Sequence, residues 1–229
     1  MVLQVLRSGM NRRSHSSQRV HVVMQTILPT QALSYEEFLA LWGDDDRYEL
    51  IDGEVIDLEP TGPHEQVGAF ILRKFNTQIE QLKLPWFTPT RCLLRPFAPG
   101  VGFRPDAIVL NQDELVKEPL WEREPTISLG STVKLVVEVV SGNWQNDYAR
   151  KVEDYAEMGI QEYWIADYLG LGGKDYIGYP KRPTLSIYDL DATRPIYQPP
   201  RQYRESDVIV SKTFPALQLS AEQILRFRD

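Results

Sequence analysis

The alternation of hydrophobic and polar residues predicts helices and strands in mixed order along the chain. LSYEEFLALW begins with Ser34 three residues before Glu37, the spacing of a capping box, and continues with helical periodicity. In RYELIDGEVIDLEP, apolar and polar residues alternate on both sides of Asp52 and Gly53, which predicts a hairpin that turns at these two residues. We therefore expect a short helix followed by a β-hairpin.

A long helix is predicted next, in TGPHEQVGAFILRKFNTQIEQL. Pro63 suits the first helical position, and His64 lies in the opening turn on the side expected to face the core. Apolar side chains then recur at every fourth position, at Val67, Ile71, Phe75 and Ile79. Beyond this helix, residues 86–110 alternate strand-like runs with Pro and Gly, and residues 111–132 read as an irregular excursion with a short helical piece.

The second half of the chain predicts a strand, a helix and a further strand. KLVVEVVS is apolar on both faces, which is typical of a central strand that is covered on both sides. A helix that ends at Gly159 and the strand IQEYWIADY follow, so a right-handed parallel crossover is expected. Strands in TLSIYDL and around DVIVS, and a last helix capped by Ser220, complete the prediction. The fold class is α/β, with a mixed central sheet flanked by helices.

Size and composition allow one principal domain. The chain has 229 residues, of which 42% are hydrophobic, and no run approaches the 18 apolar residues of a membrane span. We expect a soluble, cytoplasmic protein without a membrane partner. The single cysteine, Cys92, cannot form an internal disulfide, and its strand-like surroundings favour a buried thiol over a nucleophile.

Charge is segregated along the chain. The formal net charge is −7, which argues against a general electrostatic coat on nucleic acid but leaves room for a local basic groove. Residues 1–23 carry four arginines and no acid, and they read as a disordered basic arm before a single domain over residues 24–229. A targeting or phosphate-binding arm, and a translation start at Met24, are alternative interpretations.

Glu138 stands in the apolar run LVVEVV, where an unpartnered carboxylate costs several kcal/mol or takes up a proton. Asp106 enters a second predicted strand in RPDAIVL, and the two strands can pair as neighbours. Two adjacent carboxylates repel each other unless a cation lies between them. Because Mg²⁺ favours one or two protein carboxylates with water, we predict that Asp106 and Glu138 bind Mg²⁺, for which Mn²⁺ can substitute.

Lys151 follows on the next helix, on one stripe with Asp147 and Tyr155. This helix is expected to pack back over the sheet, so Lys151 could reach the metal site. A lysine there would orient or deprotonate the attacking water and neutralise charge on a phosphoryl oxygen. A surface pair between Asp147 and Lys151, worth a few tenths of a kcal/mol, is an equally open interpretation.

Several segments together resemble a known family. RPD, VVEVVS and DYARKVEDYAEMGIQEYWIAD, with YELIDGEVI and PTGPHEQ before them, are similar to the Uma-type restriction endonuclease family of bacteria, within the PD-(D/E)XK nuclease superfamily. The resemblance runs from about Leu33 to the C-terminus. It implies a restriction-endonuclease-like core to which an N-terminal helix and hairpin are added.

The resemblance also implies site residues. The superfamily pattern, Pro-Asp and then (Asp or Glu)-x-Lys, places Asp106 and Glu138 as metal ligands, and we add the backbone carbonyl of Val139. Val140 stands where the lysine is expected, as in relatives whose lysine has moved to the following helix, so Lys151 is the substitute. His64 is favoured as a phosphate contact or as support for the metal site, and a helix-start histidine bonded to local backbone is its alternative.

Two other acidic residues, Glu65 and Glu49, are weaker candidates for the site. Glu65 reads more readily as an acid at a helix N-terminus than as a ligand. Glu49, in YEL, lies in an alternating strand that could direct its side chain either into the sheet or outward.

The predicted function is a metal-dependent DNA endonuclease that leaves a 5′-phosphate, as the resemblance implies. A homodimer is expected, since two sites related by a two-fold axis can cut both strands of a duplex. The alternative is an inactive nucleic-acid-binding or partner-binding module that keeps the nuclease fold, which the acidic balance and Val140 favour. A purely structural domain with a neutral Glu138 is a third hypothesis, and it predicts that Glu138→Leu stabilises the fold.

Overall fold

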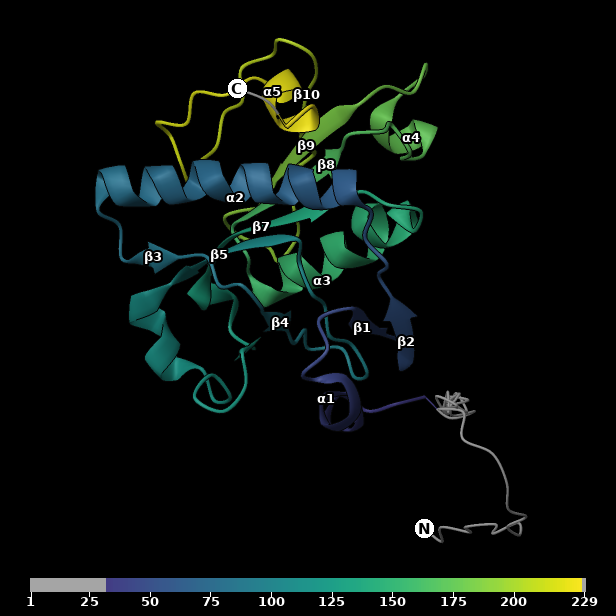
Figure 1. The fold of residues 1–229 in the computed structure, drawn as a ribbon, viewed down its shortest axis with the longest axis vertical. Helices are drawn as coiled ribbons and strands as arrows, with labels where there is room; N and C mark the ends of the chain where they lie inside the picture. The colour runs from purple at the N-terminus through teal and green to yellow at the C-terminus, as the bar shows by residue number, and fades with distance from the viewer. Residues whose placement is uncertain (1–31, 228–229) are drawn as a thin grey trace, which may run out of the picture. The chain divides into compact units, whose positions relative to one another are not determined.

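A six-stranded mixed sheet forms the centre of the fold in the computed structural model, which describes residues 32–227 (Figure 1). The predicted basic arm over residues 1–23 lies outside the described residues. The strand order is β10-β9-β8-β7-β5-β3, and β7 and β8 are parallel while the other neighbours are antiparallel. The strands are β3 (Trp86–Phe87), β5 (Ala107–Asn111), β7 (Val133–Val139), β8 (Glu162–Asp167), β9 (Thr184–Asp189) and β10 (Arg201–Tyr203).

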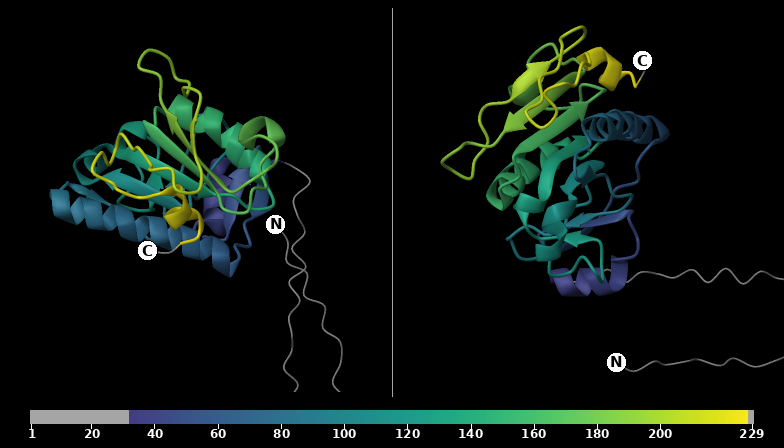
Figure 2. Two further views of the ribbon diagram at one scale, coloured as in Figure 1. Left: turned by 90° about the horizontal axis from the view of Figure 1, so that it is seen from above. Right: turned by 90° about the vertical axis from the view of Figure 1, so that its left-hand side faces the viewer.

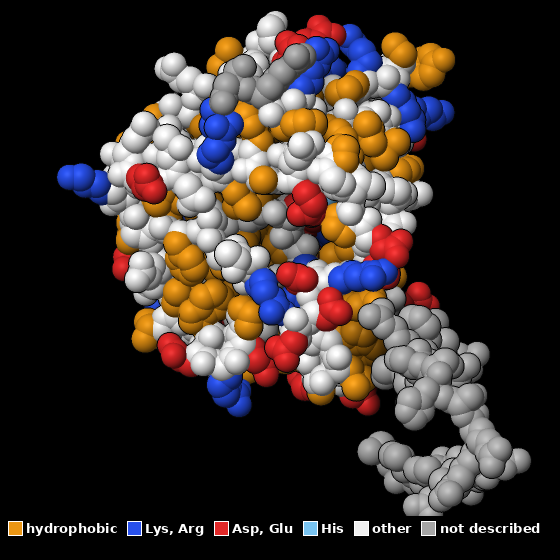
Figure 3. All heavy atoms as spheres, viewed as in Figure 1, with side chains coloured by type: hydrophobic (Ala, Val, Ile, Leu, Met, Phe, Trp, Pro, Cys, Tyr) orange, Lys and Arg blue, Asp and Glu red, His pale blue; other side chains and the backbone are white. Residues whose placement is uncertain are grey.

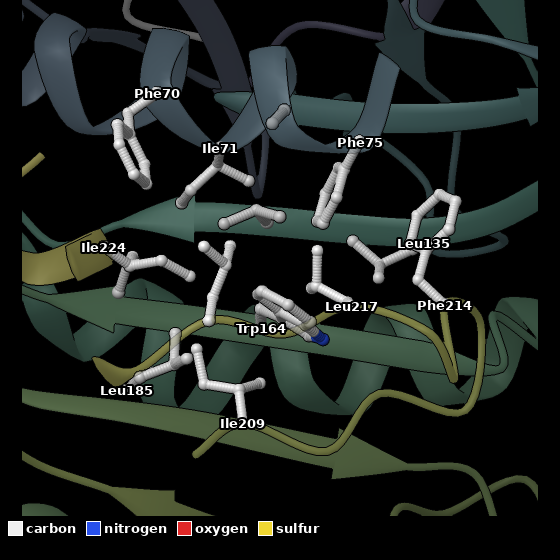
Figure 4. Close-up of a cluster of buried hydrophobic side chains, with 14 of the residues drawn as sticks. Phe70, Ile71, Phe75, Leu135, Trp164, Leu185, Ile209, Phe214, Leu217 and Ile224 are labelled. Carbon is white, nitrogen blue, oxygen red and sulfur yellow. The ribbon is translucent and has the colours of Figure 1, made fainter. Parts of the chain in front are cut away.

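Helix α2 (Gly62–Leu82) covers one face of this sheet (Figure 2). Its apolar stripe places Ile71 and Phe75 against Leu135 of β7 and Trp164 of β8 (Figure 4). The Phe75 ring meets the Trp164 ring edge to face, with 5.3 Å between centroids. Burial of each such side chain stabilises the fold by roughly 1.5–3 kcal/mol. The apolar residues at every fourth position therefore hold the helix against the sheet.

Helix α3 (Lys151–Met158) covers the opposite face (Figure 2). It continues from one π-helical turn, η3 (Asn146–Arg150), and ends at Gly159, whose φ of 85° lies in the left-handed region that favours glycine. Tyr155 packs edge to face on Tyr163 of β8. Because α3 joins the parallel strands β7 and β8, the prediction of a parallel crossover is confirmed.

The N-terminal elements form a unit beside the sheet. Helix α1 (Tyr35–Trp42) has the predicted capping box between Ser34 and Glu37. Strands β1 (Tyr48–Ile51) and β2 (Glu54–Asp57) form the predicted hairpin. Its turn residues, Asp52 and Gly53, both have positive φ, as a two-residue hairpin turn requires. Reciprocal backbone hydrogen bonds of 2.8 Å between Leu50 and Gly102 join β1 to the body of the protein.

Smaller elements occupy the connections. Strands β4 (Leu93–Leu94) and β6 (Thr126–Ile127) form a short parallel pair. The irregular excursion holds the 3₁₀ turns η1 (Gln112–Lys117) and η2 (Gly130–Thr132), and the Gly-rich segment holds α4 (Lys174–Ile177). Helix α5 (Ala221–Leu225) begins at Ser220 with the predicted cap. No helix among residues 32–227 is both long enough and apolar enough to cross a membrane.

The predicted strand around DVIVS is wrong. That segment makes only an isolated bridge, between Val208 and Ser220, and the pairing edge of β9 is taken by β10 instead. Val208 and Val210 are 65% and 56% exposed, whereas Ile209 between them is buried. The segment therefore has the alternating burial that its sequence predicts. Alternation in a sequence does not show, however, whether a neighbouring strand has an unpaired edge with which the segment could form a sheet.

Candidate active site

A cleft of about 450 Å³ opens where β5 begins and β7 ends, beside the first turn of α2 and the β1–β2 hairpin. On the face drawn in Figure 3, the surface is hollowed below α2, and both acidic and basic side chains lie around the hollow. Asp106, Glu138, Lys151 and His64 all line the cleft, as does Val139. The structure thus brings together every site residue predicted from the sequence.

The two predicted carboxylates come from paired strands. Asp106 directly precedes β5, whose Ala107 is opposite Val137 of β7, so Asp106 and Glu138 are neighbours in the antiparallel register. An Asp106 Oδ2 accepts a 2.6 Å hydrogen bond from the backbone N–H of Val139. Burial raises the pKa of both carboxyl groups, and the charge of Asp106 adds to the rise for Glu138.

Lys151 lies among three carboxylates. Its Nζ is 3.0 Å from Glu138 Oε2, 3.2 Å from Glu49 Oε1 and 3.5 Å from Asp147 Oδ1. Burial alone would lower the pKa of Lys151, but these carboxylates outweigh it and raise the pKa well above its ordinary value. The Lys151 side chain is only 4% exposed, so the alternative of a surface pair with Asp147 is wrong.

Two further acids belong to this site. Glu49, on β1, is buried, and its Oε2 accepts a hydrogen bond from the backbone N–H of Arg104 while Oε1 contacts Lys151. Asp147, in the π-helical turn, is also buried, and burial raises its pKa to about 7. Sequence alternation does not decide the direction of Glu49, and the sequence shows Asp147 only as a helical neighbour of Lys151. The i, i+4 spacing was the one signal for Asp147.

The carboxyl groups of the site are possible ligands for a metal ion. Four carboxyl groups, of Glu49, Asp106, Glu138 and Asp147, line the cleft with Lys151, whose ammonium group contacts all of them except that of Asp106. Residues 32–227 contain no group of three or more His, Cys, Asp or Glu side chains spaced to enclose a metal ion. Mg²⁺ commonly binds through one or two carboxylates, with water and substrate phosphate completing its shell. The donor set at Asp106 and Glu138 fits that mode.

His64 connects α2 to the end of β7. Its Nε2 is 2.8 Å from the carbonyl oxygen of Val139, so this nitrogen carries the proton and donates. The same Nε2 lies 3.5 Å from Asp106 Oδ2. The partner is a backbone carbonyl of another element, and not the local backbone. A carbonyl oxygen has two lone pairs, so Val139 retains one acceptor position and its role as a ligand stays a prediction.

Tyr155, on α3, forms a hydrogen bond with Glu138. Its hydroxyl donates a 2.6 Å hydrogen bond to Glu138 Oε1, and both side chains are buried. Lys151 and Tyr155 stand one turn apart on α3, so the two oxygens of Glu138 are each engaged by a different group of the same helix. This arrangement fixes the orientation of the carboxylate.

Val140 explains the position of the lysine. It is fully buried in the apolar cluster on the α3 side of the sheet, with Tyr148, Tyr163 and Ile177. An ammonium group at this position would lie among apolar side chains, which is costly. Lys151 instead approaches Glu138 from the helix on the same side.

A central mixed sheet flanked by helices, with acidic groups at the ends of two paired strands, defines this protein as an α/β domain of the restriction-endonuclease-like class. The Uma2 family, described as "Putative restriction endonuclease", matches residues 35–222. The chain belongs to this family, and the resemblance seen in the sequence is confirmed.

A solved structure shares the fold. It is that of a "putative nuclease belonging to DUF820" from Anabaena variabilis ATCC 29413, with a TM-score of 0.62 and 18% sequence identity. The match covers 85% of this chain and 98% of the other. No curated protein matched the chain.

Proposed function

We propose that this protein is a metal-dependent endonuclease that hydrolyses phosphodiester bonds in DNA. The description of its family and the nuclease description of its structural neighbour support action on nucleic acid. The single observation that carries the proposal is the convergence of Asp106, Glu138 and Lys151 from β5, β7 and α3 in one cleft. Asp106 and Glu138 would hold Mg²⁺ or Mn²⁺, which when bound supplies Lewis-acid activation of water and of the scissile phosphate.

The geometry supports a distinct proposed task for each of the surrounding residues. Lys151 lies 3.0 Å from Glu138, where its ammonium group would orient water and neutralise charge on a phosphoryl oxygen. Tyr155 holds Glu138 in place. His64 donates to the carbonyl of Val139 and approaches Asp106, so it would position the backbone that directly follows Glu138.

Cleavage of plasmid DNA tests the proposal. Purified protein is incubated with supercoiled plasmid in Mg²⁺, in Mn²⁺ and in EDTA, beside Glu138→Gln and Lys151→Ala. We expect nicking or linearisation that needs the metal and is lost in both variants. Lys174→Ala, which changes an exposed lysine of α4, is the control that should cut as the parent does. Cutting that survives both active-site changes would show a contaminant and end the assignment.

Binding without cleavage would instead support the alternative of an inactive module. Calorimetry with Mg²⁺ separates the two functions, since the inert module has no need to bind the ion at millimolar concentration. Homodimer formation is part of the same proposal for duplex cleavage, and light scattering with and without duplex DNA tests it.

A further inference from the structure

Three arginines line the cleft that holds the acidic site: Arg47, Arg91 and Arg104. Arginine presents planar donors that match the oxygens of a phosphate, so an arginine with unused donors in such a cleft is a candidate for contact with a nucleic-acid backbone. The three differ in how many of their donors the protein itself already uses.

Arg104 is committed to the fold. It is buried, its Nε donates to the carbonyl of Tyr48 at 2.8 Å, and its Nη2 donates to the carbonyls of Trp42 and Gly43 at 3.1 Å. These bonds tie the end of α1 and the start of β1 to the strand end that carries Asp106. Arg104 therefore stabilises the N-terminal unit.

Arg47 is neutralised by acids of its own hairpin. Its Nε and Nη2 reach the two oxygens of Asp57 at 2.7 and 2.6 Å, and Nη2 also contacts Glu59 at 2.6 Å. A phosphate at Arg47 would have to displace two carboxylates. Its net attraction for a phosphate is correspondingly small.

Arg91 differs from both. Its buried Nε has no hydrogen-bond partner among residues 32–227, and the nearest carboxylate, that of Asp46, is 3.9 Å away. Its Nη2 makes one long contact, 3.4 Å, to the same Gly43 carbonyl that Arg104 uses. Two guanidinium groups thus share one acceptor, and the Asp46 carboxylate at 3.9 Å compensates their positive charge only in part. The Arg91 side chain is 38% exposed, so a ligand can reach it.

We propose that Arg91 binds a backbone phosphate of the nucleic-acid strand, next to the phosphate that lies at Asp106, Glu138 and Lys151. This inference rests on the proposed nuclease function and adds a second contact to it. Arg91, on the loop between β3 and β4, and the carboxylates, at the ends of β5 and β7, line the same cleft, so a strand can meet both. The exposed part of the Arg91 side chain can donate to a phosphate, whose negative charge offsets the two neighbouring guanidinium groups.

Fluorescence anisotropy with labelled single-stranded and double-stranded oligonucleotides tests the proposal. Binding of the full chain is measured over a series of salt concentrations, in EDTA and in Ca²⁺, for the parent, Arg91→Gln, Arg91→Lys and Arg47→Gln. Arg47→Gln removes the same charge from the same cleft and serves as the matched control. Thermal unfolding confirms that each variant is folded, and Arg91→Lys preserves the charge if Arg91→Gln does not fold.

We expect Arg91→Gln to bind about tenfold more weakly at low salt. The slope of log affinity against log salt should become shallower by about 0.7–0.9, as expected for the loss of one phosphate contact. Arg91→Lys should weaken binding less, and Arg47→Gln should leave the slope unchanged. Binding by the parent that Arg91→Gln does not alter, or that Arg47→Gln weakens equally, overturns the role of Arg91 alone. No binding by the parent under any condition overturns the nuclease proposal as well.

Discussion

The ammonium group of Lys151 lies 3.0 Å from the carboxylate of Glu138, and the exposed fractions of the two side chains are only 4% and 3%. A surface ion pair contributes little to stability, but removal of one partner from a buried pair leaves an uncompensated charge in a medium of low dielectric constant. Lys151 also forms ion pairs with Glu49 and Asp147. Its loss would therefore leave these two carboxylates and that of Glu138 without their cationic partner.

Lys151→Met is expected to lower the free energy of unfolding by about 3–5 kcal/mol at neutral pH in metal-free buffer. Urea unfolding followed by circular dichroism measures the change. The exposed Lys174, replaced in the same way, should change the free energy by less than about 0.5 kcal/mol. Equal stability of Lys151→Met and the parent would mean that the carboxylates are not charged in the folded protein.

Mg²⁺ should raise the melting temperature of the parent, because an ion that binds only the folded state stabilises it by mass action. At a concentration one hundred times the dissociation constant, the gain is about 2.7 kcal/mol. Asp106→Asn and Glu138→Gln should reduce or abolish the shift, whereas Glu153→Gln, an exposed acid of α3, should retain it. A shift that sodium chloride of equal ionic strength reproduces would point to screening and not to a site.

Tyr155→Phe removes the hydroxyl that holds Glu138 Oε1 and should lower the free energy of unfolding by about 1.5–3 kcal/mol, the usual contribution of a hydrogen bond to a charged group. A double-mutant cycle with Glu138→Gln isolates this contact, and we expect a coupling free energy of about 0.5–3 kcal/mol. Tyr179→Phe changes a hydroxyl on a residue that is 89% exposed and is the matched control. Additive effects of Tyr155→Phe and Glu138→Gln would be incompatible with the bond.

The thiol of Cys92 gives a pH-dependent prediction away from the site. Burial raises its pKa from 9.0 to about 12, so the unfolded thiol ionises at a lower pH than the folded one. The contribution of Cys92 to stability is therefore fully present below pH 9 and is lost as the pH rises toward 12, by about 1.4 kcal/mol per pH unit. Urea unfolding of the parent and of Cys92→Ala at several alkaline pH values measures this contribution of Cys92 to the free energy of unfolding. A constant difference between the two proteins across this range would refute it.

Local patterns predicted much of the fold. The turn at Asp52 and Gly53 needs two residues with positive φ, and the caps at Ser34 and Ser220 need only residues three positions apart, so these features are decided within a few residues. The short strands β4 and β6 and the pairing of β10 were not predicted. A strand's partner is chosen by the whole sheet, and the alternation in DVIVS shows only which side chains face inward.

Some features of the candidate site also follow from local sequence, whereas others depend on tertiary packing. The sequence by itself determined that an acid would stand at Glu138 in an apolar strand, that Asp106 would enter a neighbouring strand and that Lys151 would follow on the crossover helix, because each depends on order and spacing along the chain. Only the tertiary structure decided that Glu49 joins them and that Lys151 is buried among several carboxylates. The four-residue strand β1 can present either face, and its direction is fixed by bonds to Gly102 and Arg104, which lie far away in sequence. Charges from separate elements interact strongly only after packing has brought them together and excluded water.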